Sequence, residues 1–283
     1  AGPEASPRIA GRGRSVNTAS GGNAGGSTLL ERLPRSVTLG LPGVLILATA
    51  ALLLAGVNQP WFLSLNRVSE FTGPWIWSNL TILGDGLVVA VLFLPLVWRR
   101  PDLIWAGLIA AALSTFLHEL IDGFVHMPRP PAVLEEGTFN VIGRPYRVGS
   151  FPSGHTTTLA TWAAVLALGS RSRSGWVLPI VVGILGGFSR VAVGVHWPAD
   201  VMAGFVLGWV SALVGLRLAA RFPGGQGPAT QKVVGALLLI CGVVLLIIDH
   251  TGYPDVLLVQ RSLALVCLVL GGRNYRALLR EAR

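Results

Sequence analysis

The feature that most restricts the fold is a series of eight apolar segments separated by polar loops. Several of them approach the roughly 20 apolar residues that a helix needs to cross a bilayer. Only 12% of the residues are charged, about half the fraction found in soluble domains. The sequence therefore predicts an all-α fold, a polytopic membrane helix bundle. The expected spans lie at about 38–57, 79–98, 103–121, 154–169, 176–195, 200–220, 232–249 and 255–271.

The distribution of basic residues predicts the topology. Residues 1–36 are rich in Gly, Ser, Ala and Arg, which is typical of a disordered tail. Most of the 22 Lys and Arg residues lie in this tail, in alternate loops and at the C-terminus, so the positive-inside rule places both termini in the cytoplasm. We therefore interpret the net charge of +9 as a topology signal and expect no nucleic-acid partner. The opposite, outer side holds Arg67, Arg129, Arg144, Arg147, Arg190 and Arg261.

Three further patterns indicate packing and membrane contact. Residues 58–78 contain several Trp and Phe residues among polar ones, which predicts an interfacial anchor or, alternatively, a lid over a lipid entrance. Glycine pairs at a spacing of four predict close helix contacts. The two cysteines lie inside apolar runs and indicate neither a disulfide nor a metal site. The glycine pairs are Gly183/Gly187 and Gly204/Gly208, and the cysteines are Cys241 and Cys267.

Polar clusters occur at the outer ends of four predicted spans. In Pro152-Ser153-Gly154-His155, a helix start offers free backbone N–H groups to an anion, and a histidine lies in the first turn. The charge distribution puts all four clusters on one side of the membrane, so we expect them to form one site. Ionisable groups near lipid are costly and usually functional. The clusters are 122–131, 153–155, 189–190 and 196–200.

These clusters contain what phosphoryl transfer requires. Arg129 and Arg190 can neutralise and orient a phosphoryl group by forked hydrogen bonds. One histidine can attack phosphorus while another protonates the leaving oxygen. Because Asp200 follows His196 by one helical turn, we predict His196 as the nucleophile and Asp200 as its orienting partner. His155 is then the general acid and later the base for water.

The same residues carry a family resemblance. Arg129-Pro130, Pro152-Ser153-Gly154-His155 and Ser189-Arg190-(five)-His196-(three)-Asp200 resemble the type-2 phosphatidic-acid phosphatase superfamily. Its signature is Lys-(six)-Arg-Pro, Pro-Ser-Gly-His and Ser-Arg-(five)-His-(three)-Asp, and the second and third parts match at every defined position. The resemblance implies a six-helix phosphatase core over residues 37–221. Residues 222–283 would add two transmembrane helices and a cytoplasmic tail.

The resemblance also implies an activity. It indicates a metal-independent phosphatase without a cofactor, acting on a membrane lipid phosphate at the outer face of a bacterial inner membrane. Phosphatidic acid, phosphatidylglycerol phosphate, undecaprenyl diphosphate and lipid A phosphates are the substrates of such relatives. Arg129, Ser153, Gly154 and Arg190 would bind phosphate. A lipid-to-lipid phosphotransferase, a lipid-binding protein with impaired catalysis, and a transporter or channel remain alternatives.

One position departs from the family pattern. Counting back from Arg129, Asp122 stands where the signature has lysine, and the chain's one lysine, Lys232, is predicted on the cytoplasmic side. A carboxylate there repels phosphate unless it is paired or protonated. Arg144 or Arg147 could supply the missing cation, or Asp122 could pair with an arginine or with His126.

Some polar residues outside the signature also have competing interpretations. His118, Asp122 and His126 recur at a spacing of four, as metal ligands on a helix do, or they are polar residues of a helix end. Asp85 and Glu119 lie near outer span ends and could either serve the site or simply cap and solvate helices. We expect the loop between the last two spans to be too short to contribute much chemistry. Its Asp249 and His250 are expected to be solvated.

Overall fold

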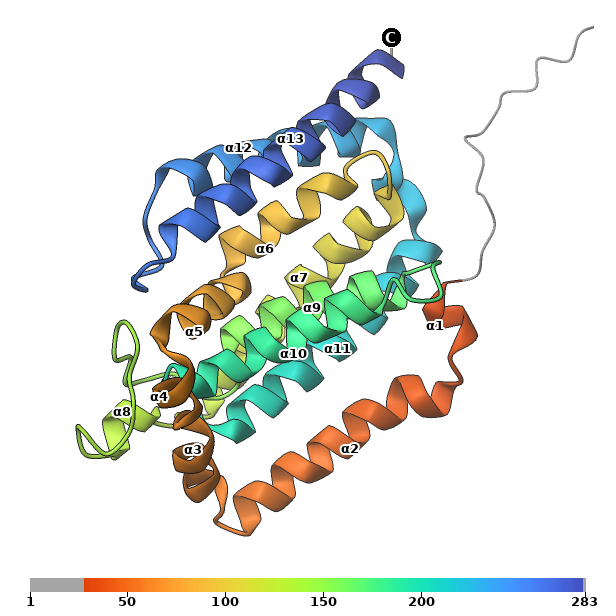
Figure 1. Cartoon of the computed structure of the whole chain (residues 1–283). Coiled ribbons are helices and arrows are strands. Elements are labelled where there is room, and N and C mark those ends of the chain that lie inside the picture. The colour runs from red at the N-terminus through yellow and green to blue at the C-terminus, as the bar shows by residue number, and fades with distance from the viewer. Residues whose placement is uncertain (1–27, 282–283) are drawn as a thin grey trace, which may run out of the picture.

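The computed structural model describes residues 28–281, and within this range the chain is helical without strands. Helix α9 (Gly154–Leu168) lies at the centre of the bundle. It is packed between α7 (Pro101–Phe124), α10 (Val177–Ala192) and α11 (Pro198–Arg221) (Figure 1). Most of its side chains are buried by these neighbours. The all-α membrane fold predicted from the sequence is confirmed.

Each of the eight predicted segments is helical, but not all are full spans. The segment at 38–57 is α2 (Arg35–Leu54), and 79–98 includes the end of α5 (Pro74–Thr81) and α6 (Gly86–Phe93). Within the described residues, four helices are long and apolar enough to cross a membrane, or up to six if two bent pairs count as spans. The other two segments form α9 and α10, of 15 and 16 residues, which are short for a span. The four long helices are α7, α11, α12 (Pro228–Ile247) and α13 (Leu257–Glu281).

The N-terminal boundary differs from the prediction. Residues 28–36, assigned to a disordered tail, form α1 (Leu29–Arg32) and the first turn of α2, while the prediction for residues 1–27 lies outside the described residues. Thr28 and Glu31 form a capping box at α1. Leu30 and Leu33 pack against an apolar cluster of α7, α9 and α11. Partial burial of these two leucines holds the segment against the bundle, although its polar composition is typical of a disordered tail.

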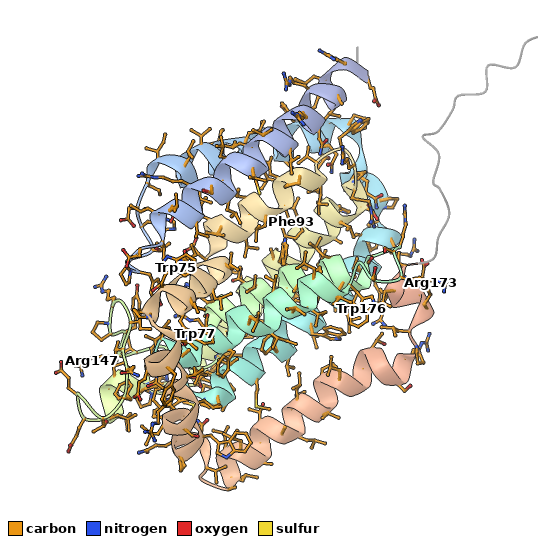
Figure 2. All side chains as sticks on the ribbon, in the orientation of Figure 1. Trp75, Trp77, Phe93, Arg147, Arg173 and Trp176 are labelled. Atoms are coloured by element: carbon orange, nitrogen blue, oxygen red, sulfur yellow. The ribbon has the colours of Figure 1, made fainter. Side chains whose placement is uncertain are left out.

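The basic residues lie at two opposite ends of the bundle, in the two groups that the sequence predicts. At the C-terminal end of α9, Arg100 Nη2 donates to the carbonyl of Gly169 (2.9 Å), and Arg32 Nη2 donates to that of Ser170 (3.3 Å). Arg147 lies at one end of the molecule, whereas Arg173 lies at the other (Figure 2). The structure thereby separates two charged ends, and the side of the membrane that each faces remains a prediction.

The aromatic segment after α2 forms α3 (Asn58–Asn66) and α4 (Val68–Thr72), and it turns 102° away from α2. Trp61, Phe71 and Trp75 are exposed, as an interfacial anchor requires. The opposite face of the segment contacts the bundle. Asn58 Oδ1 accepts a hydrogen bond from the Ala199 N–H (3.1 Å), and Asn66 Nδ2 donates to carbonyls at the end of α10. The segment therefore braces the helix ends that carry the candidate site.

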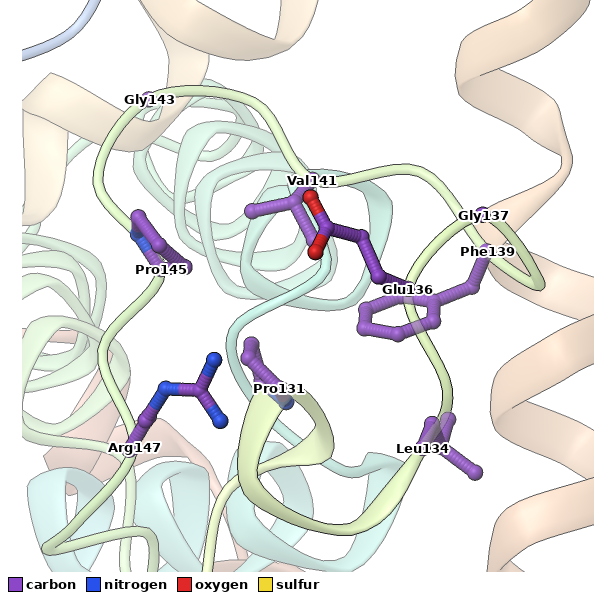
Figure 3. A pocket seen from close by; sticks show the side chains of 9 residues that line it. All are labelled: Pro131, Leu134, Glu136, Gly137, Phe139, Val141, Gly143, Pro145 and Arg147. Atoms are coloured by element: carbon purple, nitrogen blue, oxygen red, sulfur yellow. The ribbon is translucent and has the colours of Figure 1, made fainter.

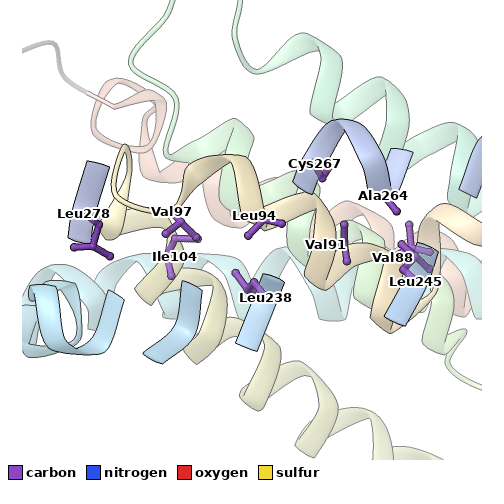
Figure 4. Close-up of a cluster of buried hydrophobic side chains, with 10 residues drawn as sticks. All are labelled: Val88, Val91, Leu94, Val97, Ile104, Leu238, Leu245, Ala264, Cys267 and Leu278. Atoms are coloured by element: carbon purple, nitrogen blue, oxygen red, sulfur yellow. The ribbon is translucent and has the colours of Figure 1, made fainter. Parts of the chain in front are cut away.

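The last two helices, α12 and α13, form a hairpin that packs against α6. The contact is an apolar cluster that includes Cys267 of α13, and Cys267 and Cys241 are free cysteines, as predicted (Figure 4). The hairpin is thus joined to the bundle by burial of apolar side chains. The buried members of the cluster are Val88, Val91, Leu94, Val97, Ile104, Leu238, Leu245, Ala264, Cys267 and Leu278.

The predicted glycine contacts are also confirmed. A Cβ atom at Gly204 would lie 2.9 Å from the Ser153 carbonyl oxygen, and one at Gly208 would lie 2.7 Å from the Thr161 nitrogen. These glycines let α11 approach the backbone of α9. Gly183 and Gly187 similarly meet α9 and the ring of Phe205.

We predict that Gly208→Ala destabilises the protein. The atoms nearest to the new methyl group belong partly to the α9 backbone, so the helices must separate, at a cost of about 1–3 kcal/mol. The melting temperature in detergent measures this effect. Gly40→Ala is the control, because a Cβ there has no neighbour within 4 Å. Equal melting temperatures for the two variants would contradict the packing argument.

Candidate active site

His196 lies in the short connection between α10 and α11. Its Nδ1 is 2.9 Å from the carbonyl oxygen of Ser150 and 3.3 Å from Asp200 Oδ2. Because a carbonyl can only accept, Nδ1 carries the ring proton and Nε2 keeps its lone pair. His196 and Asp200 are both fully buried. The predicted pair is therefore in contact, and Nε2 is turned away from the carboxylate.

Asp200 connects the second and third motifs. Its Oδ2 accepts hydrogen bonds from Ser150 Oγ (2.6 Å) and from the Trp197 N–H (2.9 Å). Its backbone carbonyl accepts one from the Ser153 N–H (3.0 Å). The first turn of α11 is thereby hydrogen-bonded to the start of α9.

The electrostatic environment of His196 favours the neutral imidazole. Burial lowers the pKa of His196 well below its usual range. The charges of Arg129, Arg190 and His155 lower this pKa further, whereas the hydrogen bond to the Ser150 carbonyl opposes them. A neutral ring at pH 7 is the form that can attack. The same interactions place the predicted general acid, His155, and two predicted phosphate-binding residues, Arg129 and Arg190, within electrostatic range of His196.

The start of α9 has the geometry of an anion site. Ser153 is the N-cap, and its Oγ accepts hydrogen bonds from the Thr156 N–H (3.4 Å) and hydroxyl (3.0 Å). The hydroxyl hydrogen of Ser153 is therefore free for another acceptor. The N–H groups of Gly154 and His155 belong to the first turn, where a helix offers no internal acceptor.

His118 of α7 holds this helix start in place. Its Nε2 is 3.2 Å from the Pro152 carbonyl oxygen, and a Cβ at Gly154 would lie 3.0 Å from the same nitrogen. A side chain at position 154 would therefore crowd the His118 ring. Among the described residues, no group of three His, Cys, Asp or Glu side chains is arranged to hold a metal ion. The contact that the structure shows for His118 is with the turn that leads into α9.

Arg190 is buried and held on one side only. Its Nη1 donates to Thr81 Oγ1 (2.6 Å) and to the Tyr253 hydroxyl (2.7 Å). Its Nε is buried without a partner in the described part of the chain. One edge of the guanidinium is therefore unoccupied by protein groups.

Arg129 is held by the loop that precedes the motif. Its Nε donates to the Val148 carbonyl (2.8 Å), and its Nη2 donates to the Gly149 carbonyl (2.8 Å). The indole Nε1 of Trp197 donates to the carbonyl of Pro128 (2.9 Å). The first motif is thereby joined to the third, and all three motifs lie at one end of the bundle.

Asp122 is partly buried, and none of the pairings considered for it is formed. No basic side chain of residues 28–281 lies within 4.0 Å of its carboxylate. A Cβ at Gly149 would lie 3.4 Å from both of its carboxylate oxygens, so Asp122 borders the loop that holds Arg129.

Arg144 and Arg147 do not take the place of the missing lysine. Arg147 lines a hollow of about 530 Å³, opposite Glu136, in the outer loop (Figure 3). Arg144 lies against the ring of Tyr146. Arg129 and Arg190, in contrast, lie close enough to His196 to lower its pKa.

The remaining polar residues near the span ends have local partners. Asp85 caps α6 by accepting from the Leu87 and Val88 N–H groups. Its Oδ1 also lies 3.2 Å from Nε2 of the exposed His250. The α12–α13 loop folds back onto the start of α6, which sequence separation could not show. Glu119 lies beside His118, with 3.5 Å between Oε1 and Nδ1.

Sequence reasoning missed four polar residues of the site. Ser150 directly precedes the second motif, and this proximity is the one available signal. His118 was noticed only for its spacing. Thr81 and Tyr253 lie far from the motifs in sequence, and nothing local distinguishes them.

Fold and site together define an α-helical membrane protein in which two histidines, two arginines and the start of a helix meet at one end of the bundle. Residues 103–223 match the PAP2 superfamily. Decaprenylphosphoryl-5-phosphoribose phosphatase of Mycobacterium tuberculosis is 33% identical over 184 residues, which cover 64% of this chain and 89% of that protein. The chain therefore belongs to the PAP2 superfamily, and the resemblance noted from the motifs is confirmed.

Two other relatives show how far the similarity extends. An undecaprenyl-diphosphatase of Sulfolobus acidocaldarius is 49% identical over 65 residues, or 23% of this chain, and the match covers only 31% of that protein. The crystal structure of Aquifex aeolicus LpxE is similar with a TM-score of 0.51 and 28% identity. That similarity covers 57% of this chain and 95% of the LpxE chain.

We predict that Asp122→Lys raises the affinity for orthovanadate, an oxyanion with the shape of phosphate. Replacing a repulsive charge at the edge of the site by an attractive one corresponds to about 1 kcal/mol, or roughly fivefold, at a partly exposed position. Calorimetric titration in detergent measures the change. Glu119→Lys makes the same charge change one turn earlier, on an exposed side chain, and serves as the control. Unchanged or weaker binding by Asp122→Lys contradicts the prediction.

Proposed function

We propose that this protein is a lipid phosphate phosphatase, which hydrolyses a phosphomonoester or diphosphate of a membrane lipid through a phosphohistidine intermediate. The observation that carries the proposal is the state of His196. Its Nδ1 proton is held by Ser150 and Asp200, so Nε2 presents a lone pair beside the charges of Arg129, Arg190 and His155.

The proposed reaction has two steps, and each residue acts in one or both of them. In the first, His196 Nε2 attacks phosphorus, the bond to the leaving oxygen breaks, and His155 gives that oxygen a proton. In the second, His155 takes a proton from water, whose oxygen attacks phosphorus, and the P–N bond breaks to release phosphate. Arg129 and Arg190 neutralise the charge on the phosphoryl oxygens.

The start of α9 supplies the remaining donors. The first-turn N–H groups and the free hydroxyl hydrogen of Ser153 would donate hydrogen bonds to the phosphoryl oxygens, which gain negative charge during attack. Because these donors are fixed by the α9 backbone and its cap, they need no reorganisation. We propose that the chain carries out both steps without a metal ion.

An apolar groove beside the motif supports a lipid substrate. The groove has a volume of about 400 Å³ and is lined by side chains of α2, α7 and α11, together with Phe151 and Pro152. Pro152 directly precedes the phosphate-binding Ser153. A hydrocarbon chain in the groove would therefore leave its phosphate at the site. The relatives named for undecaprenyl and decaprenyl compounds make polyprenyl phosphates the first substrates to test.

The charge distribution supports a location and an orientation. We propose that the protein resides in a bacterial inner membrane with both ends of the chain in the cytoplasm. The end of the bundle with the site then faces the extracytoplasmic side. The arginines around Gly169 and Ser170 at the other end support this orientation by the positive-inside rule.

We predict that His196→Ala abolishes phosphate release from lipid phosphates. Removing a nucleophile that no neighbour can replace should lower kcat by about a thousandfold or more. The assay measures inorganic phosphate from purified protein with polyprenyl diphosphate, phosphatidic acid and phosphatidylglycerol phosphate, each with and without a chelator.

The control for this assay is His126→Ala, which removes an exposed histidine beyond the end of α7. Equal release by the unchanged protein and His196→Ala would overturn the proposal. Loss of activity in the chelator would overturn the metal-independent part. Labelled phosphate found on an added acceptor lipid instead of in solution would identify a phosphotransferase.

We also predict that Ala203→Phe impairs turnover of long-chain substrates selectively. The new ring fills the groove beside Pro152, so kcat/KM for a long-chain lipid phosphate should fall about tenfold. A short, water-soluble phosphate ester should be hydrolysed as before. Val243→Phe, on the exposed apolar face of α12, is the control. Equal losses for both substrates would show that the groove does not hold the lipid chain.

A further inference from the structure

The loop between α12 and α13 reaches the candidate active site, although it lies beyond the region that matches the family. The family match ends at residue 223, before α12 begins. Tyr253 of this loop is buried in an apolar cluster with Trp77, Ile142 and Val193. We expected this loop to be too short to contribute much chemistry, so the side chain that it places beside Arg190 requires an explanation.

The contact between Tyr253 and Arg190 is directional. Arginine has only donors, so the Tyr253 and Thr81 oxygens both accept from Nη1, at 2.7 and 2.6 Å. Nη1 has two hydrogens, and these contacts use both. Nε remains buried and unpartnered among the described residues. The two oxygens thereby hold one nitrogen and leave the other edge of the fork, Nε and Nη2, free for an oxyanion.

The position of Tyr253 is fixed by several independent contacts. Gly143 has a φ of +80°, and a Cβ there would lie 2.8 Å from Tyr253 Cδ1, so the outer loop closes on the ring only with glycine. On either side of Tyr253, His250 pairs with Asp85 (3.2 Å), and the Asp255 carbonyl accepts from Asn79 Nδ2 (3.4 Å). The outer loop around Gly143 therefore closes over the ring, and the contacts of His250 and Asp255 hold the α12–α13 loop against residues 79–85.

We propose that Tyr253 is a positioning residue for Arg190, and that the C-terminal hairpin is thereby a required part of the phosphate site. The inference rests on the proposed function of Arg190 as a phosphate ligand. Without the tyrosine hydroxyl, the guanidinium keeps its charge but can rotate about its remaining contact with Thr81. The guanidinium of Arg190 is then no longer held in the orientation that binds an oxyanion through two hydrogen bonds.

The test compares Tyr253→Phe with Tyr275→Phe in the full chain. Both variants lose one hydroxyl from the same hairpin, since the Tyr275 hydroxyl donates to the Lys232 carbonyl (3.1 Å) away from the site. We expect Tyr253→Phe to bind orthovanadate about tenfold more weakly and to lose kcat/KM by a similar factor. Tyr275→Phe should bind and react like the unchanged protein. The two melting temperatures should agree.

A double-mutant cycle separates positioning from general packing. Thr81→Val removes the other oxygen on Nη1 without altering the hairpin, and should itself weaken vanadate binding. Because both oxygens hold the same nitrogen, the two losses should not add when the changes are combined. Additive losses overturn the positioning role. Thr81→Val also provides a test that does not depend on the folding of Tyr253→Phe, and vanadate affinity unchanged by Thr81→Val overturns the inference.

The failure of the inference and that of the proposed function are distinguishable. If the unchanged protein releases phosphate and Tyr253→Phe binds vanadate as well as Tyr275→Phe does, the inference is overturned and the function stands. If the unchanged protein neither binds vanadate nor releases phosphate, the proposed function fails, and the inference fails with it.

Discussion

The site depends on one buried carboxylate, that of Asp200. Its Oδ2 accepts from Ser150 Oγ, the Trp197 N–H and His196 Nδ1, and its backbone carbonyl accepts from Ser153. An isolated charge in such a place would be strongly unfavourable, and these donors offset much of that cost. Because the side chain of Asp200 binds His196 and Ser150 while its backbone carbonyl binds Ser153, this one residue joins three segments of the site. The orientation of His196 and the position of the start of α9 follow from the same residue.

This arrangement needs helices that approach each other closely. Gly204 and Gly208 bring α11 against the backbone of α9, near the point where Asp200 and Ser153 meet. A Cβ at Gly204 would crowd the Ser153 carbonyl oxygen, beside the point where the first turn of α11 meets the start of α9. The small residues of the bundle thus contribute to the arrangement of the site as well as to packing.

In this chain, the C-terminal hairpin adds contacts to the family core. The hairpin packs on α6 by apolar contacts, and its loop then extends to Arg190. The same loop pairs His250 with Asp85, the cap of α6. The turn before Asp85 is close to His155, since a Cβ at Gly84 would lie 2.7 Å from the His155 carbonyl oxygen. An extension outside the family match is therefore in contact with Arg190 and with the cap of α6, next to the turn that approaches His155.

The sequence by itself determined the membrane class, the positions of the eight helical segments and the motif residues at their ends. Apolar runs and motif spacing are local properties of the chain, so they can be read without coordinates. It could not determine that residues 28–36 include a helix, that α10 is short, or that Asp122 has no basic partner within 4.0 Å among the described residues. Nor could it find Thr81 or Tyr253, or place His118 against the start of α9, because no motif includes these residues. Their roles arise from contacts between distant segments, and such contacts are decided only when the helices pack.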